Sequence, residues 1–148
     1  MRKLALRGII ALISTTVVLA QATPAPKTVP QGTVLKMLQG TWVVSTQNGQ
    51  DATGGPETTI TITDNKYVQT AAGSVLERGT FTIDESKKPI ALDVSVAEGD
   101  DAGSTKVGIV DVSEAVMKAK ISSAGGSTRP SDFTVTDGFV VLTLTKKK

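Results

Sequence analysis

Hydrophobic and polar residues alternate with a period of two along most of the chain after residue 40. The clearest run is residues 90–96, which place Ile90, Leu92, Val94 and Val96 on one face and Ala91, Asp93 and Ser95 on the other. Because successive side chains of a strand point to opposite faces, this run predicts a strand with one buried and one solvated face. Comparable runs bounded by turn residues predict strands at residues 42–44, 58–63, 66–71, 79–84, 106–112, 115–121 and 138–145.

A different pattern precedes the first strand. Residues 32–38 bring four apolar side chains onto one face of a two-turn helix, those of Val34, Leu35, Met37 and Leu38. Gly40 is available as the left-handed residue that ends this helix. So short a helix is not stable alone in water, and we expect it to pack on the strands.

About eight short strands without a second helix predict an all-β fold, either an antiparallel barrel or a sandwich. Periodicity does not separate the two. The short helix followed by Gly40-Thr41-Trp42 and a meander of hairpins resembles the lipocalin and calycin group of up-and-down barrels. The resemblance implies that the helix closes one end of the barrel, that Trp42 packs across its floor, and that Lys146 lies over the indole.

Further motifs are similar to those of a family of uncharacterised exported bacterial domains known chiefly from planctomycetes. They run in the family's order through the chain from about residue 34, and they are Leu38-Gln39-Gly40-Thr41-Trp42, Gly79-Thr80-Phe81, Ser86-Lys87-Lys88-Pro89, Glu98-Gly99, Gly108-Ile109, Arg129-Pro130-Ser131-Asp132-Phe133 and Leu142 to Lys146. This resemblance implies export and the barrel fold, and it implies no activity.

The first 22 residues have the pattern of a secretory signal peptide. Arg2, Lys3 and Arg7 precede an apolar run over residues 8–19, and Ala20-Gln21-Ala22 has the small-x-small form of a cleavage site. We expect cleavage after Ala22 and a secreted or periplasmic protein without stable membrane insertion. The alternative is an uncleaved anchor, although the run is shorter than the roughly 20 residues that span a bilayer. Residues 23–31 contain three prolines and predict an extended linker before a single domain at residues 32–148.

Composition narrows the function classes. Removing the three cations of the signal from 16 basic residues leaves 13 against 14 acidic ones, a net charge of −1, which does not favour a nucleic-acid partner. The chain has no histidine and no cysteine, so the common general base, the common zinc ligands and thiol catalysis are missing. We therefore expect no enzyme activity, no metal and no cofactor, and we expect the terminal Lys146-Lys147-Lys148 to be a solvated tail.

Two charged groups have competing interpretations. Glu98, Asp100 and Asp101 offer the oxygen ligands that calcium prefers, but Asp and Gly are also what a hairpin turn requires, and we expect a turn. Arg129 and Asp132 flank Pro130 and Ser131, and we expect them to pair and clip the loop to the barrel rim. The alternative places Arg129 at the mouth of a pocket, where it meets an anionic head group.

A barrel of eight strands has room either for packed side chains or for one small ligand. The sequence predicts mostly medium-sized aliphatic residues inside. We therefore expect a binding module for a small apolar or amphipathic molecule. The alternative is a structural or interaction domain with a filled barrel and no ligand. The size of the inward side chains decides between them, and the expected lining residues are Leu92, Val94, Ile109, Met117 and Leu142.

Overall fold

The computed structural model describes residues 32–148, so the predicted signal peptide and linker lie outside the described residues. These described residues form one helix, α1 (Thr33–Leu38), and nine strands: β1 (Gly40–Gln47), β2 (Gln50–Asp51), β3 (Thr58–Thr63), β4 (Lys66–Ala71), β5 (Ser74–Asp84), β6 (Ile90–Glu98), β7 (Thr105–Val112), β8 (Val116–Ser122) and β9 (Phe139–Lys146). No helix within residues 32–148 has the length and apolar character needed to cross a membrane.

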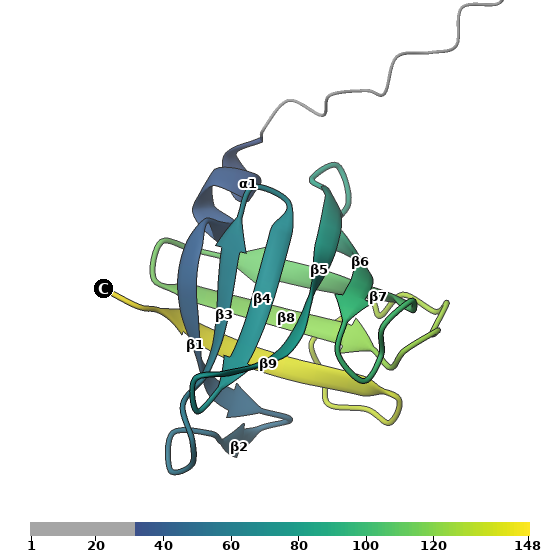
Figure 1. Ribbon diagram of the computed structural model, residues 1–148. Helices are drawn as coiled ribbons and strands as arrows, with labels where there is room; N and C mark the ends of the chain where they lie inside the picture. The colour runs from purple at the N-terminus through teal and green to yellow at the C-terminus, as the bar shows by residue number, and fades with distance from the viewer. Residues whose placement is uncertain (1–31) are drawn as a thin grey trace, which may run out of the picture.

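Eight of the strands form a closed barrel. Each pairs antiparallel with its neighbour in the order β1, β3, β4, β5, β6, β7, β8, β9, and pairing of β9 with β1 closes the ring. The two-residue β2 pairs only with the end of β1. Figure 1 shows α1 at the top of the barrel and β2 at the bottom. The predicted fold class, an antiparallel up-and-down barrel of about eight strands with a short N-terminal helix, is confirmed.

The helix ends differently from the prediction. Its last residue is Leu38, Gln39 is already extended with φ −61° and ψ 141°, and Gly40 opens β1 at φ +113°. The side chain of Gln39 explains this ending. Its amide nitrogen donates to the carbonyls of Leu35 and Asp64, and its amide oxygen accepts from the backbone N–H of Asp64. The exit of the helix is thereby tied to the turn between β3 and β4.

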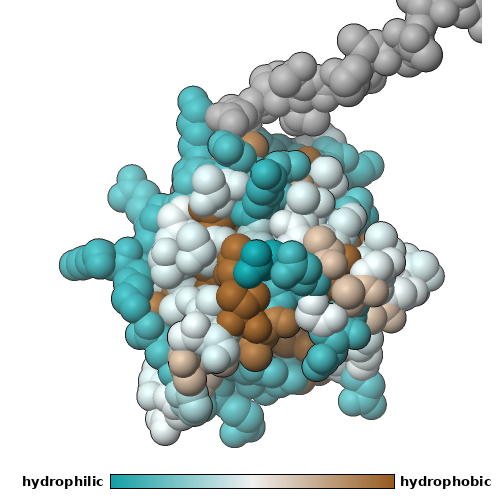
Figure 2. Space-filling model, viewed as in Figure 1, coloured by the Kyte–Doolittle hydropathy of each residue, from teal (hydrophilic) through white to brown (hydrophobic). Residues whose placement is uncertain are grey.

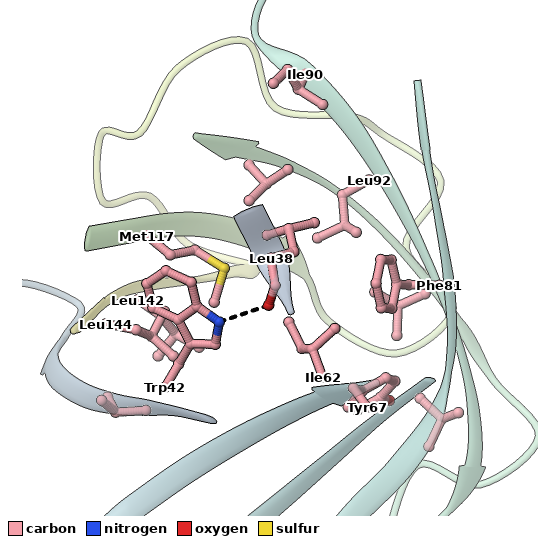
Figure 3. Close-up of a cluster of buried hydrophobic side chains, with 14 residues drawn as sticks. Leu38, Trp42, Ile62, Tyr67, Phe81, Ile90, Leu92, Met117, Leu142 and Leu144 are labelled. Carbon is pink, nitrogen blue, oxygen red and sulfur yellow. Dashed lines mark hydrogen bonds between the residues drawn. The ribbon is translucent and has the colours of Figure 1, made fainter. Parts of the chain in front are cut away.

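Trp42 joins the helix to the barrel. Its side chain is fully buried, and its indole Nε1–H donates to the carbonyl of Leu38 at 2.8 Å, as Figure 3 shows. The ammonium of Lys146 lies 5.1 Å from the centre of the indole ring and donates to the carbonyl of Met37 at 3.3 Å. The indole, the last residue of β9 and the last turn of α1 therefore close this end of the barrel together.

The strand β5 is longer than the predicted 79–84. Residues 74–78 do not alternate between buried and exposed, because a register shift between Gln69 and Thr70 of β4 leaves Val75 and Leu76 both exposed.

The outer surface is otherwise mostly polar. In the view of Figure 2 residues of hydrophilic and intermediate hydropathy cover most of the face, with a narrow hydrophobic strip near its middle.

Residues 123–138, between β8 and β9, cover part of the outer wall. Two cations attach this loop. Arg129 donates to the carbonyls of Leu92 and Gly108 and pairs with Asp93 at 2.6 Å. Lys120, which is 3% exposed, donates to the carbonyl of Thr134 at 2.6 Å, and its ammonium lies 5.0 Å from the centre of the Phe139 ring. The wall beneath this loop is therefore buried on both of its faces.

Candidate functional site

A cavity of about 250 Å³ lies inside the barrel and is partly open to solvent. Leu38 of α1 and residues from all eight barrel strands line it. Most of the lining is apolar, and it includes Ile60, Ile62, Phe81, Leu92, Met117, Leu142 and Leu144. Figure 3 shows several of these side chains converging on the space beside the indole.

The inward side chains explain why the lumen stays open. Among the buried residues of the described range 32–148, only Trp42, Tyr67 and Phe81 are aromatic, and Trp42 lies at the helix end. The other apolar residues of the lining are Val, Ile, Leu, Met and Ala, which are smaller than an aromatic ring system. A dry cavity of about 150 Å³ binds benzene, and pockets for drug-sized ligands begin near 300 Å³. The lumen therefore suits a ligand of roughly ten heavy atoms.

The polar part of the lining lies toward the end opposite α1. Because β1 starts at Gly40 beside the helix, its last residue Gln47 marks this far end, and Gln69, Glu77, Lys106 and Ser122 lie on the corresponding halves of their strands. Gln47 and Val140 at this far end are exposed, whereas Leu38 at the helix end is buried, so the cavity opens at the far end. The cavity is thus amphipathic, with an apolar floor against α1 and a mostly polar opening.

Three of the polar lining residues form a connected cluster. The Tyr67 hydroxyl donates to Glu77 Oε1 at 2.7 Å, and the Lys106 ammonium donates to Glu77 Oε2 at 2.8 Å. Lys106 also pairs with Asp101 Oδ2 at 2.8 Å, from the turn between β6 and β7. The side chains of Lys106 and Glu77 are only 15% and 16% exposed, so this pair is shielded from solvent far more than a surface ion pair.

Protonation in the cluster follows from these contacts. Burial, reinforced by the hydrogen bond to Glu77, raises the pKa of Tyr67 well above its ordinary 10.0. Burial opposes the charged form of Lys106, but the hydrogen bonds to Asp101 and Glu77 outweigh it and raise the pKa of Lys106 above 10.5. Near neutral pH the opening therefore presents a neutral phenol and a cationic ammonium held by two carboxylates.

These shifts predict a loss of stability in alkali. Tyr67 and Lys106 both bind their proton more tightly in the folded protein than in the unfolded chain, so their contribution is complete below pH 10.0 and is lost as the pH rises through the raised values. We expect the free energy of unfolding in urea to fall as the pH rises above about 10. Tyr67→Phe should reduce this slope.

The single tyrosine of the chain provides a direct check of the same prediction. Tyrosinate absorbance in the ultraviolet should appear only together with loss of the β-sheet circular dichroism signal. Ionisation at the ordinary tyrosine pKa with the circular dichroism spectrum unchanged would contradict the buried hydrogen bond to Glu77.

The structure places four of the five expected lining residues in the cavity, namely Leu92, Val94, Met117 and Leu142. The prediction for Ile109 is wrong. Lys106 and Val110 line the lumen, so Ile109, one position out of phase, faces outward. It is nevertheless only 1% exposed, because it lies in a second, outer pocket beside Arg129 and Pro130 of the 123–138 loop. An outward residue that a loop covers is as hydrophobic as a residue of the barrel interior. The sequence therefore did not distinguish the two positions for Ile109.

The structure corrects the predicted partner of Arg129 and places Arg129 outside the lumen. Arg129 binds Asp93 and two strand carbonyls, whereas Asp132 accepts from the backbone N–H of Thr134 and lies 3.7 Å from Lys120, so the predicted Arg129–Asp132 pair does not form. Arg129 also does not line the lumen; it lies on the outer wall in the second pocket, of about 420 Å³. Its donors are used in holding the loop.

The acidic turn is a turn, with Ala102 N–H bonded to the Gly99 carbonyl and Asp101 directed to Lys106. Within residues 32–148 no group of three or more potential metal-ligating side chains comes together. Gly40, Trp42 and Lys146, the structural motif of the sequence, lie together at the helix end, where a Cβ on Gly40 would be 3.3 Å from Lys146 Cε.

The polar opening was not predicted from the sequence, above all Tyr67, Glu77 and Lys106. A signal for two of them was present. Counting back by two from the inward Phe81 reaches Gly79 and Glu77, and counting back from Val110 reaches Gly108 and Lys106. Charged residues of a strand usually face solvent, and only the assembled barrel shows that these two charges pair inside it.

Comparisons with protein-family models, with curated proteins and with solved structures find no match to this chain.

Proposed function

We propose that this protein is an exported, non-catalytic barrel that binds a small apolar or amphipathic molecule in its lumen. The observation that carries the proposal is the cavity of about 250 Å³ with apolar walls and a polar opening. A side-chain-filled barrel would leave no such space. The export component rests on the first 22 residues of the sequence, and the non-catalytic component rests on the absence of histidine and cysteine from the chain.

The cavity limits the affinity that a small probe can reach. Burying each methylene of an aliphatic chain contributes about 0.8 kcal/mol, and association opposes this with several kcal/mol. The six carbons of n-hexanol therefore contribute at most about 5 kcal/mol, and the cost of association leaves a dissociation constant in the millimolar range or weaker. Nuclear magnetic resonance of methyl groups detects binding in this range and identifies the site.

We expect n-hexanol to cause saturable shifts in the methyl signals of Leu92, Met117 and Leu142, which line the lumen. Ala119→Phe should abolish them. Ala119 also lines the cavity, and a phenyl ring needs about 150 Å³, more than half of the space available. The control is Val116→Phe, which adds the same ring at a 38% exposed position of the same strand and should leave binding unchanged.

Two results would count against the proposal. If n-hexanol produces no saturable shift in any lumen methyl, the alternative of a structural or interaction domain without a ligand is favoured. If Ala119→Phe binds as well as the wild type while remaining folded, the probe binds elsewhere.

A further inference from the structure

We propose that the natural ligand is a short aliphatic primary amine, bound as its ammonium ion with the ammonium group at the Tyr67–Glu77–Lys106 opening. This inference rests on the proposed function, because it assigns a chemical class to the ligand of the same lumen. Three observations support it: the hydrogen-bonding capacity left in the cluster, its net charge, and its position relative to the apolar wall.

After its internal hydrogen bonds are counted, the Tyr67–Glu77–Lys106 cluster has more free acceptor positions than free donors for a ligand. Each oxygen of Glu77 accepts one hydrogen bond, from Tyr67 or from Lys106, and a carboxylate offers about four acceptor positions. The Tyr67 hydroxyl has used its only donor and keeps its lone pairs. Lys106 has committed two of its three donors, to Glu77 and Asp101. A ligand group that mainly donates hydrogen bonds matches these free acceptors. An ammonium group has three donors and no acceptor.

The charge at the opening has the matching sign. Glu77 and Lys106 are the charged residues among those that line the cavity, and Asp101 neutralises Lys106 from the outer side. Two carboxylates and one ammonium leave a net charge of −1. A ligand ammonium is therefore attracted to the cluster, and hydrogen bonds to an ionised partner are stronger than neutral ones.

A carboxylate head group meets the opposite situation. It would find a single remaining Lys106 donor and would lie beside the Glu77 carboxylate, and two like charges in a shielded site repel one another. The same cluster that holds an amine thus discriminates against fatty acids of equal length. Specificity of this kind needs an unfavourable contact with the competitor as well as a favourable one with the ligand.

The apolar wall sets the length of the ligand. Glu77 and Phe81 lie on the same face of β5, so an ammonium at Glu77 directs its aliphatic chain past Phe81 toward Leu38 at the helix end. Since the cavity measures about 250 Å³, a chain of roughly six carbons fits this path and much longer chains do not.

A matched series of probes tests the assignment. n-Hexylamine, n-hexanol and heptanoate share a six-carbon alkyl chain and differ only in the head group, and near pH 7 the first is a cation and the last an anion. Titrations of the lumen methyl signals at low ionic strength should give n-hexylamine as the tightest ligand, n-hexanol next and heptanoate weakest, with about tenfold between the amine and the acid. Heptanoate binding as tightly as n-hexylamine would overturn the inference.

The n-hexanol arm separates the two proposals. If n-hexanol saturates the lumen methyls but the amine has no advantage over it, the lumen binds ligands and the assignment of an amine is wrong. If none of the three probes shifts the lumen methyls, the proposed function fails as well.

Glu77→Gln assigns the preference to one residue. The substituted amide keeps an oxygen for Tyr67 and leaves Lys106 its pair with Asp101, but it removes the negative charge at the opening. We expect n-hexylamine to bind about tenfold more weakly, with n-hexanol changed less than about twofold. The control is Glu98→Gln, the same change near the same end of the barrel at a 63% exposed side chain outside the cavity lining. An equal loss for both probes in Glu77→Gln would show that Glu77 does not recognise the charge.

Discussion

Trp42→Ala should lower the free energy of unfolding by about 3 to 5 kcal/mol, a large share of the stability of a small domain. The side chain is fully buried, and an indole removes about 150 to 250 Å² from water. Transfer alone accounts for up to about 6 kcal/mol as an upper limit. Thermal unfolding followed by circular dichroism should show a decrease in Tm of roughly 10 to 20 °C.

The loss is large because Trp42 holds two other elements. Without the indole, the carbonyl of Leu38 loses its hydrogen bond and Lys146 loses the ring beneath its ammonium. The helix α1, which is six residues long, has little stability of its own and should detach from the barrel. The cavity would then be open at both ends.

Trp42→Phe serves as the control because it keeps an aromatic ring on the floor and removes only the Nε1–H donor and part of the contact area. We expect a smaller loss, about 1 to 2 kcal/mol. A shift of only a degree or two in the Tm of Trp42→Ala would show that the indole does not support the helix end.

Gly79→Ala should be the second most damaging change, with a loss of about 2 to 3 kcal/mol. A Cβ at this inward position of β5 would overlap the backbone carbonyl oxygen of Ser95 and would lie 3.1 Å from Cε1 of Tyr67. Gly79 pairs with Tyr67 across β4 and β5, so the ring occupies the space that a side chain would take. The methyl group must displace strand β6, the tyrosine ring, or both.

Displacement of the ring also changes the opening of the lumen. We expect Gly79→Ala to weaken the hydrogen bond from Tyr67 to Glu77, so tyrosinate should appear at a lower pH than in the wild type. Urea unfolding measures the stability change and ultraviolet absorbance follows the tyrosine.

Gly54→Ala is the matched control for Gly79→Ala, because no atom lies within 4 Å of a Cβ at that loop position. It should change stability by less than about 0.5 kcal/mol. Equal effects at the two glycines would mean that the close approach of β5, β6 and Tyr67 is not a real constraint.

Much of the fold followed from local patterns. The alternation in residues 90–96 correctly predicted a strand that buries Ile90, Leu92, Val94 and Val96, because a strand with one dry face imposes a period of two on its own residues. The short apolar helix before Trp42 was also predicted from a local pattern, because the residues of its apolar face lie close together in the sequence.

The candidate site was less predictable. Four lining residues were identified because they lie in phase on clear strands, but Ile109 was misplaced and Glu77 and Lys106 were missed. A hydrophobic residue in a strand indicates that its side chain is buried. It does not indicate whether that side chain faces the lumen or lies under a loop on the outer wall. A charged residue signals exposure unless its partner is known, and the partners of Lys106 come from β5 and from the turn after β6.

The sequence by itself determined most of the strands, the inward faces of the clearest ones and hence an all-β fold, because these depend on the order of neighbouring residues. Tertiary structure alone decided the pairing of β9 with β1, the covering of Ile109 by residues 123–138, and the meeting of Tyr67, Glu77 and Lys106. Each of these joins residues on different strands or loops, and no local period encodes which distant residues become neighbours when the barrel closes.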